Sequence, residues 1–193
     1  MSLIEYIAIS IAFGIDSMLV MRRHTLQMPI RLTHGLAVSI MLAIVFSVMF
    51  YAGIQLGQLL RFTSPTGDAD MLNTNTMVFV GLVVLTSIKM LFSIRRNKKK
   101  ELSLYDLSRW STVVALSIAS GINVMIVGMG IGFLPSTTGD RWNALIPIAI
   151  ATWLLSYWGI MMGRQKVELR ENRWLVVALL LLLSTTVYRI TLL

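Results

Sequence analysis

Long apolar segments alternate with short polar ones along the whole chain. Six apolar segments can be marked, at residues 2–21, 34–60, 76–94, 111–134, 143–163 and 174–192. About 20 consecutive apolar residues span the hydrocarbon core of a bilayer as a helix. In lipid, every backbone N–H and C=O must be satisfied within its own segment, which favours helices. The pattern therefore predicts an all-α integral membrane protein with six transmembrane helices.

The polar stretches between these segments have the composition of loops and turns. Residues 63–76 contain Pro65, Gly67 and two aspartates, and we predict an external loop there. The break after the fourth segment, residues 135–140, combines Pro, Ser, Thr, Gly and Asp, which are turn-forming residues. Both stretches separate helices in the predicted topology.

Composition supports the membrane assignment and excludes several function classes. Only 13% of the 193 residues are charged, against about 25% in a soluble domain. The net charge of +8 would suit nucleic acid, but the basic residues lie in short loops beside apolar segments, so we expect a lipid bilayer and no nucleic acid as partner. With no cysteine, disulfides and thiolate sites are excluded. We find no nucleophile–base pair and no cofactor motif, and predict neither an enzyme nor a cofactor.

The charge distribution also predicts an orientation. With six spans the loops alternate between two sides, and thirteen of the seventeen basic residues fall on one side. These include the cluster from Arg95 to Lys100. Cytoplasmic loops carry the excess of Lys and Arg, so we expect the basic loops inside and both termini outside, in the inner membrane of a bacterium.

Two pairs of segments resemble each other at nearly one offset. Residues 13–20 and 120–127 share Gly, Ile, Met and Val in place, with Asp16 facing Asn123, at an offset of 107 positions. Residues 51–57 and 157–163 share Tyr, Gly, Ile and Gly at an offset of 106 positions. Two ordered matches predict a duplication of a three-helix unit.

The duplication divides the chain into a first repeat at 1–94, a basic cytoplasmic linker at 95–109 and a second repeat at 110–193. Because three is an odd number, the second repeat starts on the opposite side of the membrane, and the halves are inverted repeats. Secondary transporters share this plan, with the substrate site near the midplane between the halves. A scaffold protein could carry the same duplication as ancestry alone.

Small residues within the predicted helices favour close packing. Glycines let helix backbones approach each other in lipid. The candidates for helix packing are Gly14, Gly53, Gly57, Gly121, Gly159 and Gly163.

Three polar residues lie at predicted membrane depth, where ionisable groups are costly and tend to mark function. Asp16 is in the first segment and Lys89 in the third, and Asn123 is the repeat counterpart of Asp16. Carboxylate and amide oxygens are ligands for hard divalent cations such as Mn²⁺, so Asp16 and Asn123 are the candidate metal ligands. Lys89 is either part of the site or a side chain that reaches the interface.

These segments resemble the MntP-type manganese efflux pumps, small bacterial exporters built from two three-helix repeats. The family's Asp-Ala motifs of helices one and four align with residues 14–17 and 121–124. Residues 115–120 and 127–134 look like its fourth helix, 159–164 like its fifth, and Lys89 falls at a basic position of its third. The resemblance implies Mn²⁺ export.

The chain departs from the family at three acidic positions. By resemblance, a Glu of the second helix falls at Phe46, a Glu of the third at Ser93, and the Asp of the fourth at Asn123. Of these membrane carboxylates only Asp16 is present.

We therefore predict a secondary transporter that exports a small cation, with Mn²⁺ as the candidate substrate, by alternating access. Asp16 would be the main ligand or proton-coupled group and Asn123 the neutral ligand. A non-transporting membrane scaffold that binds a partner is the second hypothesis, and transport of an anion or neutral solute attracted by Lys89 is the third. The coupling ion is left open, and an oligomer is compatible with the sequence.

Overall fold

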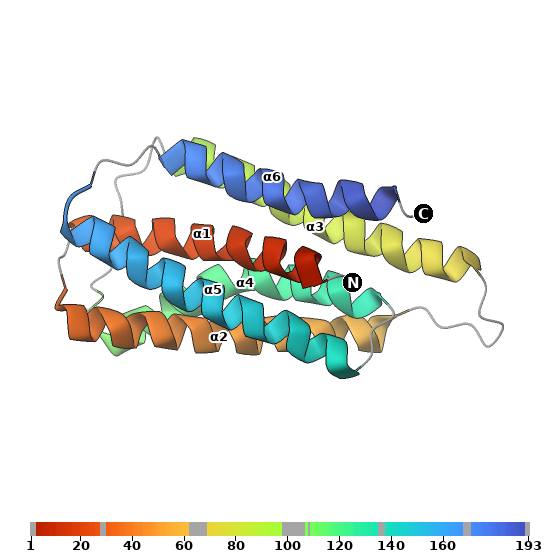
Figure 1. Cartoon of the computed structure of the whole chain (residues 1–193), viewed down its shortest axis with the longest axis horizontal. Coiled ribbons are helices and arrows are strands. Elements are labelled where there is room, and N and C mark those ends of the chain that lie inside the picture. Colours follow the sequence, from red (N-terminus) through yellow and green to blue (C-terminus); the bar gives the residue numbers. More distant parts are fainter. Residues whose placement is uncertain are drawn as a thin grey trace.

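The computed structural model describes residues 3–27, 30–61, 69–97, 107, 109–134, 138–167 and 171–191. The described residues form six helices (Figure 1), so the predicted all-helical fold is confirmed. Their bounds are α1 Leu3–Gln27, α2 Leu32–Leu60, α3 Ala69–Asn97, α4 Trp110–Phe133, α5 Thr138–Arg164 and α6 Glu171–Ile190. Five helices contain a stretch that is long and apolar enough to cross a membrane, namely α1, α2, α4, α5 and α6. A sixth span through α3 stays a prediction.

Several helix ends lie further out than the apolar pattern predicts. The prediction of an external loop at residues 63–76 is wrong from residue 69 onwards, because α3 begins at Ala69. A helix can continue beyond an apolar segment because polar residues at its ends interact with water and with the helix dipole. For the same reason α1 continues through Arg22 and Arg23 to Gln27. The remainder of that loop, residues 62–68, and residues 135–137 lie outside the described part.

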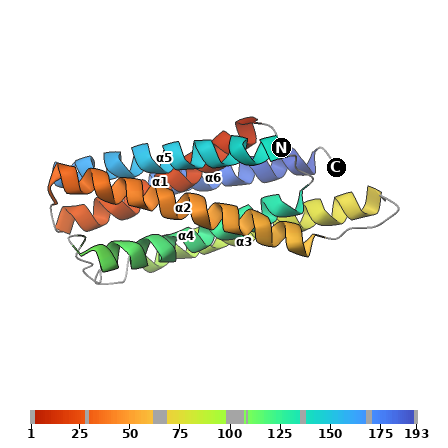
Figure 2. The ribbon, with the colours of Figure 1, turned by 90° about the horizontal axis from the view of Figure 1, so that it is seen from below.

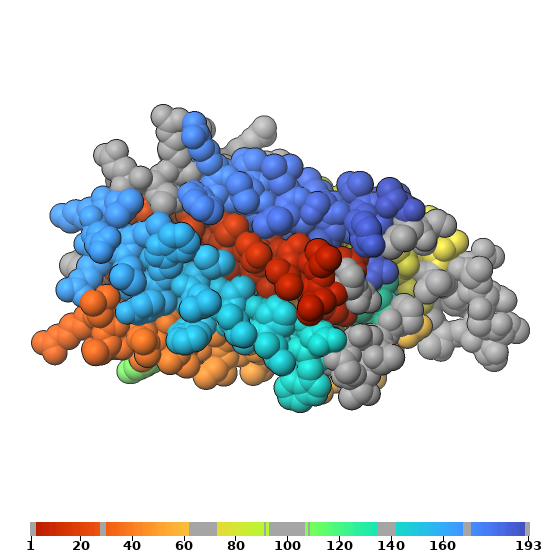
Figure 3. All heavy atoms as spheres, in the orientation of Figure 1, coloured from red at the N-terminus to blue at the C-terminus, as the bar shows by residue number. Residues whose placement is uncertain are grey.

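The helices are arranged so that each packs mainly against two others. Among the described residues, the main contacts run α1–α5–α2–α4–α3–α6 and back to α1, which closes a ring. Exchanging α1, α2 and α3 for α4, α5 and α6 leaves this set of contacts unchanged. Figures 1 and 2 show the helices nearly parallel to one axis, and α1 reaches the surface as a strip between α5 and α6 in Figure 3.

The closest approach of α2 and α4 occurs at glycines. A Cβ atom on Gly53 would collide with the backbone oxygen of Met125, and one on Gly57 with the backbone oxygen of Met129. Because these obstacles are backbone atoms, no side-chain rotation could relieve a substitution. Glycine is therefore what allows these two helices to touch.

The contact of α1 with α5 repeats this arrangement at equivalent positions. A Cβ on Gly159 would collide with the backbone oxygen of Met18, and one on Gly163 would lie 2.6 Å from that of Arg22. Met18 and Arg22 precede Met125 and Met129 by 107 positions. The two helix pairs thus use matching glycines against matching backbone positions.

The remaining candidate glycines also form an equivalent pair. A Cβ on Gly14 would meet the side chain of Leu155, and one on Gly121 the side chain of Met49 at 3.1 Å. Leu155 and Met49 are 106 positions apart. All six glycines predicted for helix packing therefore lie at contacts between helices.

The ends of the bundle are distinguished by the chain termini. The N and C marks lie at the same end in both ribbon views, as an even number of antiparallel helices requires. Following the colours in Figure 1, α1 and α4 run in opposite directions. At the other end of the bundle α1 ends, α2 begins, and α5 is followed by α6.

Candidate functional site

A cavity of about 230 Å³ lies where α1, α3, α4 and α6 meet. The three polar residues predicted at membrane depth all line it, although they come from three different helices. The described lining consists of Asp16, Leu19, Val20 and Arg23 of α1, Lys89 and Met90 of α3, Ala119, Ser120 and Asn123 of α4, and Leu175 of α6.

Helical spacing explains how α1 and α4 supply this lining. Residues three, four and seven apart share one face of a helix. Asp16 and Arg23 are seven residues apart, and both line the cavity. Ser120 and Asn123 are three residues apart on α4 and face the same space.

The two candidate ligands, Asp16 and Asn123, have oxygens free to bind a further group. The Oδ1 atom of Asn123 is buried and has no hydrogen-bond partner. Within the described residues, Asp16 forms no hydrogen bond and no ion pair within 4 Å, although the charges of Arg23 and Lys89 act on it. A buried polar atom without a partner costs free energy, so the Asn123 oxygen favours a ligand in the cavity.

This set of oxygens suits a hard cation. The carboxylate of Asp16 carries the negative charge, and the amide oxygen of Asn123 and the hydroxyl of Ser120 are neutral oxygen donors of the kind that Mn²⁺ accepts. In the part of the chain that the structure describes, no group of three or more His, Asp and Glu residues could hold a metal ion.

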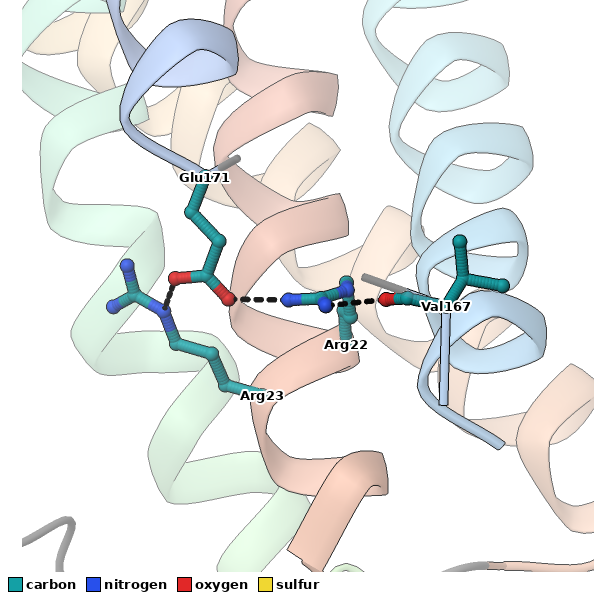
Figure 4. Close-up of polar contacts among 4 residues, drawn as sticks. All are labelled: Arg22, Arg23, Val167 and Glu171. Atoms are coloured by element: carbon teal, nitrogen blue, oxygen red, sulfur yellow. Dashed lines mark hydrogen bonds and ion pairs between the residues drawn. The ribbon is translucent and has the colours of Figure 1, made fainter. Parts of the chain in front are cut away.

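Next to the cavity, two arginines of α1 share one carboxylate of α6. The Nη1 atom of Arg22 donates to Glu171 at 2.6 Å, and the Nε atom of Arg23 donates to the other Glu171 oxygen at 2.7 Å. The Nη2 atom of Arg22 donates to the backbone oxygen of Val167 at 2.5 Å (Figure 4). The cluster fixes the start of α6 against α1 and holds the Arg23 guanidinium in place.

Sequence reasoning missed two features of this region. The charge pattern counts Arg22 and Arg23 only among the thirteen basic residues of one side, although the spacing of seven residues between Asp16 and Arg23 places both on one face of a helix. Glu171 lies far away in the sequence, and no pattern in the sequence pairs it with them. These ion pairs depend on tertiary packing.

Two of the positions at which the family resemblance implies an acidic residue are Phe46 and Ser93. Phe46 is fully buried, with its ring 3.9 Å from a Cβ placed on Gly121. The side chain of Ser93 lies outside the described part. Position 46 is thus occupied by a packed aromatic ring that offers no metal ligand.

The fold and the cavity define a multi-pass helical membrane protein with a small polar site between its helices. Residues 29–187 match the family described as "Putative manganese efflux pump", and the chain belongs to this family. The matched range contains Lys89 and Asn123 but begins after Asp16. No curated protein and no solved structure matches the chain. The resemblance predicted from the sequence is thus confirmed, and the family is one of transporters rather than enzymes.

Proposed function

We propose that the protein exports a divalent cation, with Mn²⁺ as the first candidate, through the cavity that Asp16 and Asn123 line. In this proposal Asp16 is the charged ligand and Asn123 the neutral ligand. The observation that carries it is the meeting of these two residues in one cavity, although they are 107 positions apart and lie on α1 and α4. Membership of the family described as putative manganese efflux pumps supports Mn²⁺ as the substrate.

Alternating access between two inverted halves is the proposed mechanism. Three observations support it: the helix contacts are unchanged when the halves are exchanged, the glycine contacts of α1–α5 and α2–α4 occupy equivalent positions, and α1 and α4 run in opposite directions. In such a protein, rocking one half against the other opens the site to each side in turn.

The basic end of the bundle is proposed to face the cytoplasm of a bacterium. Arg22, Arg23 and Arg164 lie towards the end of the bundle opposite the two termini. The excess of Lys and Arg on cytoplasmic loops then puts both termini outside. The cavity, lined by Arg23, lies nearer to this cytoplasmic end and would be loaded from inside the cell.

The test is flux of Mn²⁺ from vesicles that contain the purified protein. Asp16→Asn removes the charged ligand and should abolish Mn²⁺ flux. Asn143→Ala is the matched control, because Asn143 is exposed near the start of α5 and outside the cavity lining. Unchanged flux in Asp16→Asn, with a normally folded protein, would refute the mechanism.

A non-transporting scaffold is the second candidate. It is favoured by the buried phenyl ring at position 46 and by the absence of a group of three possible metal ligands among the described residues. This function predicts no Mn²⁺ flux from the unmodified protein and stable co-purification with a second membrane protein. Asp16→Asn would then leave that association unchanged.

A further inference from the structure

The charges around the cavity do not balance as those of a simple cation site would. Asp16 is the only carboxylate among the described lining residues, whereas Arg23 and Lys89 are both cations. A dication in this space would be attracted by one group and repelled by two. The two cations, however, are held very differently.

Arg23 is fixed by its ion pair. Its Nε atom is 2.7 Å from Glu171, and its side chain is only 18% exposed. The same carboxylate binds Arg22, so moving the Arg23 side chain away would disrupt a shared cluster. The carboxylate of Glu171 partly compensates the positive charge of Arg23.

Lys89 has no such restraint. It forms no hydrogen bond and no ion pair within the described residues, and its side chain is exposed. A lysine side chain is a flexible stem with a compact charge at its tip, and this one lines the same cavity as Asp16. Among the described residues, Lys89 is therefore the cation of the cavity that no ion pair fixes.

We propose that Lys89 is the counter-ion of Asp16 when no cation is bound, and that the transported cation replaces it. This inference rests on the proposed function and concerns the same site. An isolated carboxylate at membrane depth is costly, so a positive partner stabilises the ionised Asp16 when the cavity holds no cation. The two partners exclude each other, because Lys89 beside a bound dication would repel it.

A double-mutant cycle on the metal-free protein tests the pairing without transport. Lys89→Gln should lower the unfolding temperature by about 3 °C, and Asp16→Asn by a similar amount. In the Asp16→Asn background, Lys89→Gln should have no further effect. Lys89→Arg keeps the charge, so its unfolding temperature should stay near that of the unmodified protein. Additive effects of the two substitutions would overturn the proposal, because a lysine that only reaches the membrane surface is independent of Asp16.

Titration of the purified variants with Mn²⁺, followed by the paramagnetic resonance of free Mn²⁺, gives the second readout. Removing one repelling charge from a dication site should tighten binding about tenfold in Lys89→Gln. If Asp16→Asn weakens Mn²⁺ binding but Lys89→Gln does not tighten it, the counter-ion role fails and the proposed function stands. If Asp16→Asn leaves Mn²⁺ binding unchanged, or no variant binds Mn²⁺, the proposed function fails as well.

Discussion

Glu5 and Arg189 join the first and the last helix at the end of the bundle where both termini lie. Arg189 donates from Nε to one oxygen of Glu5 at 2.8 Å and from Nη2 to the other at 3.1 Å. Glu5 is only 4% exposed although it lies in the first turn of α1. Together with the Glu171 cluster at the opposite end, this pair holds α6 against α1 along its length.

Arg189→Met should therefore destabilise the protein. Removing one partner of a buried ion pair leaves an uncompensated charge; because Arg189 is partly exposed, we expect a loss of about 1–3 kcal/mol. Arg189→Lys should lose less, since it keeps the charge. Thermal unfolding in detergent, followed by tryptophan fluorescence, measures both. Arg164→Met, at an exposed arginine of α5, is the control, and an equal loss there would contradict a specific role for the pair.

Gly53→Ala and Gly159→Ala should each separate a helix pair. In both, the new methyl group would collide with a backbone carbonyl of the facing helix, and overpacking of this kind costs about 1–3 kcal/mol. The equivalence of the two contacts predicts losses of similar size. Gly81→Ala is the control, because a Cβ there meets nothing within 4 Å, and its effect should stay within about 0.5 kcal/mol. Comparable unfolding temperatures for all three variants would refute the packing role.

The apolar pattern was sufficient to predict the helices because each one must satisfy its own backbone groups in lipid. It could not place their ends, as α3 shows by starting at Ala69. At its ends, a helix depends on side-chain charge and on contact with water. Hydropathy alone therefore does not predict the residue at which a helix begins or ends. The basic linker predicted at residues 95–109 likewise overlaps α3, which continues to Asn97.

At the candidate site, individual polar residues could be predicted from the sequence. The residues that lie next to them in the fold could not. Asp16, Lys89 and Asn123 stand out because each is polar within an apolar segment. The internal repeat suggested that Asp16 and Asn123 lie together. Nothing in the sequence pairs Arg23 with Glu171, because this contact depends on how α1 and α6 pack. The charge around the cavity, which decides what it can bind, is thus a property of the fold.

Asn123→Asp should raise the affinity of the cavity for Mn²⁺. It places a second carboxylate beside Asp16, where the unpartnered amide oxygen now lies, and one added charge near a dication should tighten binding by about tenfold or more. Asn123→Leu removes the oxygen and should weaken binding. Asn143→Asp adds the same charge outside the cavity lining and should leave the Mn²⁺ affinity nearly unchanged. Equal Mn²⁺ affinities of the Asn123→Asp and Asn143→Asp variants would show that Asn123 is not a ligand.

The absence of cysteine from the sequence makes the proposed orientation directly measurable. Thr191 follows α6 at the end of the bundle where the termini lie, and Gln165 follows α5 at the opposite end; both side chains are exposed. If the basic end is cytoplasmic, a maleimide that cannot cross the inner membrane should label Thr191→Cys in intact cells. It should label Gln165→Cys only after the membrane is permeabilised. The reverse pattern would place the termini inside, and the cavity would then open towards the outer side of the membrane and could not be loaded from the cytoplasm.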